Sequence, residues 1–218
     1  MRTAASLPAP LSRPEELANS ITHGLGLALS IVGTVVLLDR TARYGNLLQV
    51  VGVSVYGATL VALYAASTLS HSFQRPRLRH FFRTVDQVCI FLLIAGTFTP
   101  VALTYFVGGW WWALFLSVWG LALVGIFFKL FYTKLHNVSL GAYVFLGSLP
   151  FVAIRPIIES GPAHLLTGFA AGCLMYTLGT YFLMRDDRVP YFHAAWHVFV
   201  IAGSACHYYA VLCLVPVA

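Results

Sequence analysis

The sequence predicts an all-α integral membrane protein built as a bundle of seven membrane-spanning helices. Of its 218 residues, 59% are hydrophobic and only 9% are charged, whereas a soluble domain carries about 25% charged residues. The mean hydropathy is +0.81. The apolar residues fall into seven runs, each close to the roughly 20 residues that a helix needs to cross a bilayer. Lipid therefore solvates most of this chain.

Short polar or turn-like segments separate the seven runs. We place the spans at residues 17–38, 47–71, 86–106, 110–130, 138–155, 162–184 and 192–214. Residues 17–214 then form one transmembrane domain, preceded by a short tail of residues 1–16. Because only the segment VGG separates the third span from the fourth, these two are expected to form a tight helical hairpin.

The first helix has a recognisable start. Ser12 and Glu15 have the spacing of a capping box, and Pro14 suits the first turn. Glu15 and Glu16 suit the positive end of the helix dipole. The preceding segment has no apolar core of the kind that a signal peptide carries, so the first span is expected to stay in the mature protein.

Two later features also have structural interpretations. Pro100 lies in the third span, where a kink is expected. The three tryptophans at residues 110–112 are typical of an aromatic anchor at the outer membrane interface. The four cysteines all lie in apolar runs and contain no CxxC pair, so they indicate small buried side chains instead of a disulfide framework.

The positive charges predict the orientation. If the spans alternate in direction, ten Lys and Arg residues fall on the side of the N-terminal tail and three on the other side. Since cytoplasmic loops carry the excess of Lys and Arg, the N-terminus is predicted in the cytoplasm and the C-terminus outside. The net charge of +6 thus reflects topology in a plasma or inner membrane, and no nucleic-acid partner is expected.

Polar residues gather at one end of the predicted bundle. They begin the first, third and seventh spans and end the second: Glu16, Asn19, His23, Ser67, His71, Asp86, His193 and His197. Odd spans begin and even spans end on the cytoplasmic side, so all of these residues share one depth. A single such residue is more often interfacial or bonded to its own helix. Convergence of several within hydrocarbon instead favours a functional site.

The spacing of these residues predicts a metal site. His193 and His197 lie four residues apart, which places them on one helix face, and His71 has the right depth to join them. Zinc in catalytic sites has three protein ligands and one open position. Asp86 would either hold the metal-bound water or complete a tetrahedral site. Iron and manganese stay open as alternative metals.

Two other histidines, His23 and His207, are less suited to bind this metal. His23 has the right depth, and we expect it to contact a metal-binding histidine instead of binding the metal itself. His207 follows His193 by 14 residues, which corresponds to roughly 20 Å along a helix. It therefore lies too far away to join the same site.

Four motifs carry a resemblance to a known family. They are ELANSITHGLG near the start, STLSH followed by Asp86, AGTFTP, and HAAWH near the end. In order and spacing, across nearly the whole chain, they resemble the hemolysin III branch of the progestin and adipoQ receptor family. The resemblance implies one zinc ion held by His71, His193 and His197, and a role for Asp86 in holding a zinc-bound water. By the same resemblance, Ser67 corresponds to the serine of the family motif SxxxH, and Glu16, Asn19 and His23 belong to the first family motif.

The same resemblance suggests an activity. The family belongs to a wider group that includes alkaline ceramidases, which implies hydrolysis of an amide or ester bond in a membrane lipid. Some bacterial members are linked to membrane-fluidity homeostasis. The hormone-receptor members carry a long cytoplasmic N-terminal region, whereas this chain has only about 15 residues there. That difference argues against hormone-type signalling.

Three functions are considered for a chain with these features. The first is a zinc-dependent lipid hydrolase in which Asp86 orients water or acts as general base and Ser67 hydrogen-bonds nearby. The second is a sensor or receptor whose zinc is structural and which binds lipid as a ligand. The third, a pore-forming cytolysin, is disfavoured because a pore needs a polar lining across the whole bilayer. Self-association into a homo-oligomer stays open.

Overall fold

The structure, a computed structural model, describes residues 12–105, 111–131, 138–153, 158–159, 161 and 163–215. Its elements are all helical, and no strand occurs among the described residues. In chain order they are α1 (Arg13–Tyr44), α2 (Leu47–Ser72), α3 (Pro76–Tyr105), α4 (Trp111–Phe131), α5 (Val138–Ser148), the short 3₁₀ helix η1 (Leu149–Ala153), α7 (Ala163–Leu183) and α8 (Phe192–Leu212).

Six of the described helices are long and apolar enough to cross a membrane: α1, α2, α3, α4, α7 and α8. This confirms an all-α protein that passes through the membrane several times. The fifth predicted span, residues 138–155, is represented by α5 and η1, and its apolar helical part is only Leu140–Val152. The count of seven spans and the orientation of the termini remain predictions.

The third predicted span differs most from its helix. The sequence places the apolar run at residues 86–106, but α3 begins at Pro76, so the basic segment before Asp86 is helix and not loop. Hydropathy detects only the part of a helix that lies in lipid, whereas backbone hydrogen bonds continue into the polar turns. Pro100 lies inside α3, which continues through it as one element, and a bend there remains a prediction.

The predicted start of α1 is confirmed. The Ser12 side chain accepts a hydrogen bond from the Glu15 backbone N–H at 3.4 Å, and the Ser12 N–H donates to the Glu15 carboxylate at 3.0 Å. Asn46 and Gln49 form an equivalent capping box at the start of α2. Both caps satisfy backbone N–H groups that have no partner within the helix, and they determine where each helix begins.

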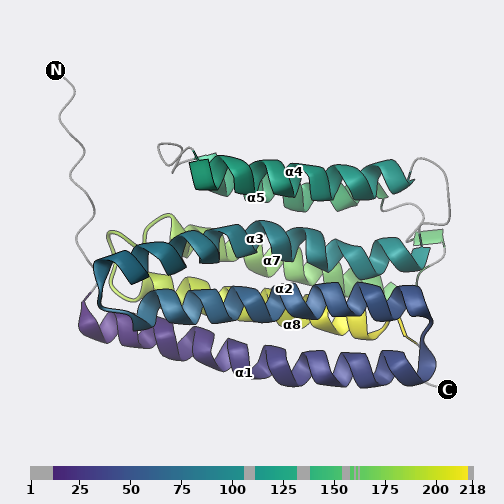
Figure 1. Cartoon of the computed structure of the whole chain (residues 1–218), viewed down its shortest axis with the longest axis horizontal. Coiled ribbons are helices and arrows are strands. Elements are labelled where there is room, and N and C mark those ends of the chain that lie inside the picture. The colour runs from purple at the N-terminus through teal and green to yellow at the C-terminus, as the bar shows by residue number, and fades with distance from the viewer. Residues whose placement is uncertain are drawn as a thin grey trace.

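The helices lie side by side along one long axis (Figure 1). One hydrophobic core joins α1, α2, α3, α7 and α8, and a second joins α3, α4 and α5. α3 and α4 pack together as the predicted hairpin requires, although the turn between them lies outside the described residues. The starts of α1, α3 and α8 and the end of α2 lie at the same end of the bundle. The polar residues of the sequence analysis are therefore brought to one end, as expected.

Small residues allow α7 and α8 to pack closely. A Cβ atom at Gly172 would collide with the His207 ring, and one at Gly168 would lie 2.9 Å from the Ala210 Cβ. Close packing through glycine is typical of membrane helices, which gain little from the hydrophobic effect when they associate in lipid. The resulting contact fixes α8, and with it the two histidines at its start.

This packing predicts that Gly172→Val destabilises the protein. Overpacking of this kind costs about 1–3 kcal/mol, so the thermal unfolding midpoint in detergent should fall. Gly120→Val in α4 is the matched control, because a Cβ atom there would meet nothing within 4 Å. Equal midpoints for the two variants would contradict the assigned role of this contact.

Candidate metal centre

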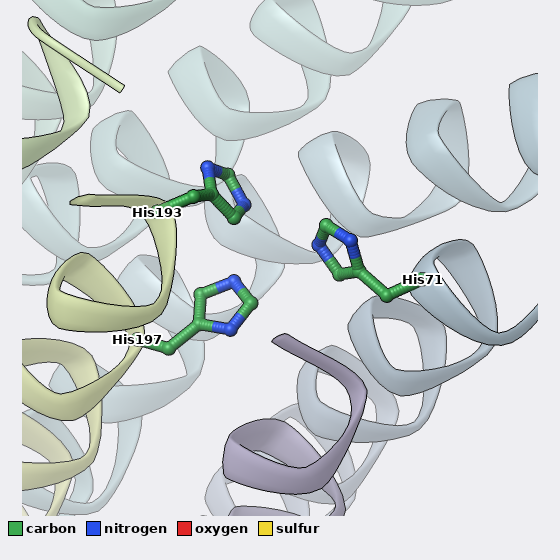
Figure 2. Close-up of side chains that lie close together, drawn as sticks. All are labelled: His71, His193 and His197. Carbon is green, nitrogen blue, oxygen red and sulfur yellow. The ribbon is translucent and has the colours of Figure 1, made fainter. Parts of the chain in front are cut away.

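Three histidine side chains converge at the polar end of the bundle (Figure 2). His71 comes from the last turn of α2, and His193 and His197 come from the first turns of α8. One ring nitrogen of each lies within 4.8 Å of the others. Zinc–nitrogen bonds of about 2.0–2.1 Å in a tetrahedral site place ligand nitrogens roughly 3.4 Å apart. Small side-chain rotations therefore bring the three rings to metal-binding geometry.

Two of the three rings have a carboxylate at their Nδ1 atom. The Nδ1 atom of His71 lies 2.7 Å from Glu16 Oε2, and the Nδ1 atom of His193 lies 2.6 Å from Asp186 Oδ2. An ionised carboxylate can only accept a hydrogen bond, so each Nδ1 must carry the proton. In the neutral form of each ring, Nε2 then carries the lone pair that a metal ion would bind.

The third ring is held by the backbone of α1. The Nδ1 atom of His197 lies 3.2 Å from the Asn19 carbonyl oxygen and 3.1 Å from the Thr22 hydroxyl. A carbonyl oxygen also only accepts, so this ring has the same tautomer. Histidines that bind metals almost always donate their other N–H to a carboxylate, carbonyl or water. All three rings of the cluster satisfy this requirement, so the donor set suits a metal ion.

Glu16 connects the cluster to the basic start of α3. Its side chain is 3% exposed, and its Oε1 atom lies 3.2 Å from an Arg79 nitrogen and 3.9 Å from an Arg83 nitrogen. The Arg79 contact is an ion pair without hydrogen-bond geometry. A buried carboxylate needs such countercharges, because isolation of a charge from water is costly. The two arginines thereby help to keep Glu16 in place against His71.

Asp86 and Ser67 lie beside the cluster. Asp86, on α3, is partly buried, and its carboxylate pairs with the Ser67 hydroxyl. The convergent set among the described residues consists of the three histidines and does not include Asp86. The role of Asp86, as a holder of water or as a fourth ligand, stays a prediction.

His23 packs directly on one member of the cluster. Its ring stacks on His197 with 3.5 Å between ring centroids, and its Nδ1 atom lies 2.6 Å from the Ser67 hydroxyl. The ring also meets Tyr64 edge-on. His23 is therefore placed as a partner of a candidate ligand and not within the convergent set.

Asp186 is the contact that sequence reasoning missed. It lies in the turn between α7 and α8, seven residues before His193, where no continuous helix joins the two residues. Tyr191, which has a left-handed backbone (φ 63°), ends this turn and begins α8. That conformation is uncommon outside glycine and clusters at functional sites. The one available signal was an acidic pair within an otherwise basic loop.

A cavity between the start of α1 and the end of α2 reaches His71. It has a volume of about 460 Å³ and is lined by the start of α1 and the end of α2, including Arg13, Glu16 and His71. Ser20 and Ser72 lie against each other at its wall, with 2.8 Å between their hydroxyl oxygens. The cavity gives water and small polar groups access to His71.

Comparison with known proteins identifies close relatives. The family described as Haemolysin-III related matches residues 11–208. The chain is 39% identical to Hemolysin-3 of Bacillus cereus, covering 91% of this chain and 90% of the relative. It is 37% identical to the Hemolysin-3 homolog of Bacillus subtilis (strain 168), covering 91% and 93%. It is also 30% identical to the human monocyte to macrophage differentiation factor, covering 90% and 83%.

The contact between Asp186 and His193 predicts that Asp186→Ala weakens metal binding. Loss of an outer partner of a ligating histidine typically costs 10–100-fold in metal affinity, measurable by competition with a chromogenic zinc chelator. Asp187→Ala is the matched control, because Asp187 is exposed and pairs with Arg188 instead. If both variants kept the affinity of the unmodified protein, Asp186 would have no role in the site.

Proposed function

This chain belongs to the haemolysin-III related family, and we propose that it is a zinc-dependent hydrolase that cleaves an amide or ester bond in a membrane lipid. The observation that carries the proposal is the set of three imidazoles whose Nδ1 atoms all face oxygen acceptors. Such an activity near the cytoplasmic leaflet would adjust membrane lipid composition, and a role in lipid homeostasis follows from it.

The number of protein ligands favours catalysis over a purely structural role. Structural zinc sites are usually closed by four protein ligands, whereas catalytic sites have three and leave one position open. The convergent set here has three members among the described residues. When bound, zinc in such a site activates water as a nucleophile near neutral pH and polarises a carbonyl group.

Asp86 is assigned the role of proton acceptor. Its carboxylate pairs with the Ser67 hydroxyl, and the single Ser67 proton is used in that bond. Ser67 then accepts a hydrogen bond from the Nδ1–H of His23, 2.6 Å away. This chain of contacts orients the carboxylate, which takes a proton from the attacking water and delivers it to the leaving group.

The position of the site suits a lipid substrate. The cavity lies at the end of the bundle, where headgroups would lie, and the adjacent face of α1 presents large apolar side chains to the surroundings, among them Leu17 and Ile21. Acyl chains can therefore stay in the membrane while the scissile bond approaches the cluster. Leu17 itself belongs to the cavity wall.

A second candidate function is a sensor or receptor with a structural metal. The cluster joins α2 to α8, and its outer partners include α1. A metal bound only by the folded bundle would stabilise it by mass action. In that case Asp86, which lies outside the convergent set, would have no catalytic task.

Asp86→Asn distinguishes the two candidates. For a hydrolase, the turnover of fluorogenic lipid amides and esters in micelles should fall by about 10²–10⁴-fold, the usual effect of a lost general base, while metal content stays unchanged. Asp39→Asn is the control, since Asp39 is exposed and pairs with Arg43 within α1. Turnover that survives in Asp86→Asn would contradict the assignment. An absence of turnover in the unmodified, metal-loaded protein would favour the sensor.

A further inference from the structure

The buried face of α1 carries a polar residue between two that contact the cluster. Glu16 contacts His71, and His23 contacts His197. Asn19 lies three residues after Glu16 and four before His23, so the three share one helix face. Asn19 therefore lies between Glu16 and His23 on the face of α1 that packs against the histidine cluster.

Asn19 has buried polar atoms without a partner. The residue is 1% exposed, and among the described residues neither its Oδ1 nor its Nδ2 atom forms a hydrogen bond. Its backbone carbonyl holds His197, but the amide group takes no part in that contact. Gln49, a buried amide elsewhere in the bundle, donates to the Leu214 carbonyl at 3.2 Å. Buried side-chain amides are rarely left unsatisfied, so the exception requires a reason.

His23 adds a second unsatisfied atom in the same place. The ring is 3% exposed, and its Nε2 atom has no partner among the described residues. Together, Asn19 and His23 offer an amide donor, an amide acceptor and a ring nitrogen, and none of the three atoms has a partner among the described residues.

We propose that Asn19 and His23 form a binding subsite for a hydroxyl-bearing, uncharged lipid headgroup. A hydroxyl both donates and accepts, so it can satisfy Asn19 Oδ1 or His23 Nε2 and also Asn19 Nδ2. A phosphodiester group offers only acceptors, so it would leave the Asn19 Oδ1 acceptor without a donor. The inference rests on the proposed function and narrows its substrate to lipids whose headgroup is uncharged and carries a free hydroxyl.

The test uses a lipid that cannot be hydrolysed. Binding of 1-O-dodecylglycerol, an uncharged ether diol, is measured by saturable thermal stabilisation, beside its di-O-methylated analogue. Asn19→Leu should weaken binding of the diol about tenfold, as expected for a lost hydrogen-bond partner in a buried site. The methylated analogue should bind weakly to every variant. Asn19→Ala repeats the test if leucine packs poorly.

A further readout separates this subsite from a structural role. Removal of an unsatisfied buried amide should raise the thermal midpoint of the ligand-free Asn19→Leu protein above that of the unmodified protein, with zinc content unchanged. Ser30→Ala is the control, because Ser30 is buried on α1 but bonds its own helix at the Leu27 carbonyl. It should change neither quantity.

Equal binding of the diol by Asn19→Leu and the unmodified protein, or equal binding of diol and methylated analogue, would overturn the proposal. Because the probe carries no scissile amide or ester, its binding is independent of turnover. A protein that binds the diol through Asn19 but hydrolyses no lipid would support the subsite and contradict the hydrolase. A protein that hydrolyses lipids but does not bind the diol would support the hydrolase and contradict the subsite.

Discussion

Three hydrogen bonds on the outer edges of three imidazole rings are the constraint on which the site depends. Each ring gives its Nδ1 proton to an oxygen: Glu16 for His71, Asp186 for His193 and the Asn19 carbonyl for His197. The inner nitrogens are thereby left as lone pairs facing one another. Three imidazoles whose ring nitrogens converge at one end of the bundle form a donor set that suits a metal ion.

The oxygen acceptors come from α1 and from the turn before α8, whereas the rings come from α2 and α8, so the bundle must be assembled before the site exists. Glu16 and Asn19 lie on α1, and Asp186 lies in the turn before α8. Glycines let α7 and α8 approach closely, and capping residues fix the starts of α1 and α2. Arg79 and Arg83 supply positive charge to the buried Glu16 carboxylate. Packing and electrostatics therefore act on the same few side chains.

Helical periodicity predicted which residues share a helix face, but it could not predict contacts made by residues in turns. Helical spacing placed Glu16, Asn19 and His23 on one face, and the common depth of span ends brought His71 near His193. The partner of His193 was not predictable, because a turn with an unusual backbone at Tyr191 returns Asp186 to the start of α8. Hydropathy does not detect the part of a helix that lies outside lipid, so it does not predict that α3 begins at Pro76. The fifth predicted span, residues 138–155, extends past the described residues, so its length stays a prediction.

Metal content of the purified, detergent-solubilised chain tests the central claim most directly. It should be measured by mass spectrometry on the unmodified protein, on the His193→Ala/His197→Ala double variant and on His80→Ala, whose residue is exposed on α3. The account predicts about one zinc per chain in the unmodified protein and in His80→Ala, and none in the double variant. A protein that contains no metal when purified without chelator, or a double variant that keeps it, would contradict the account.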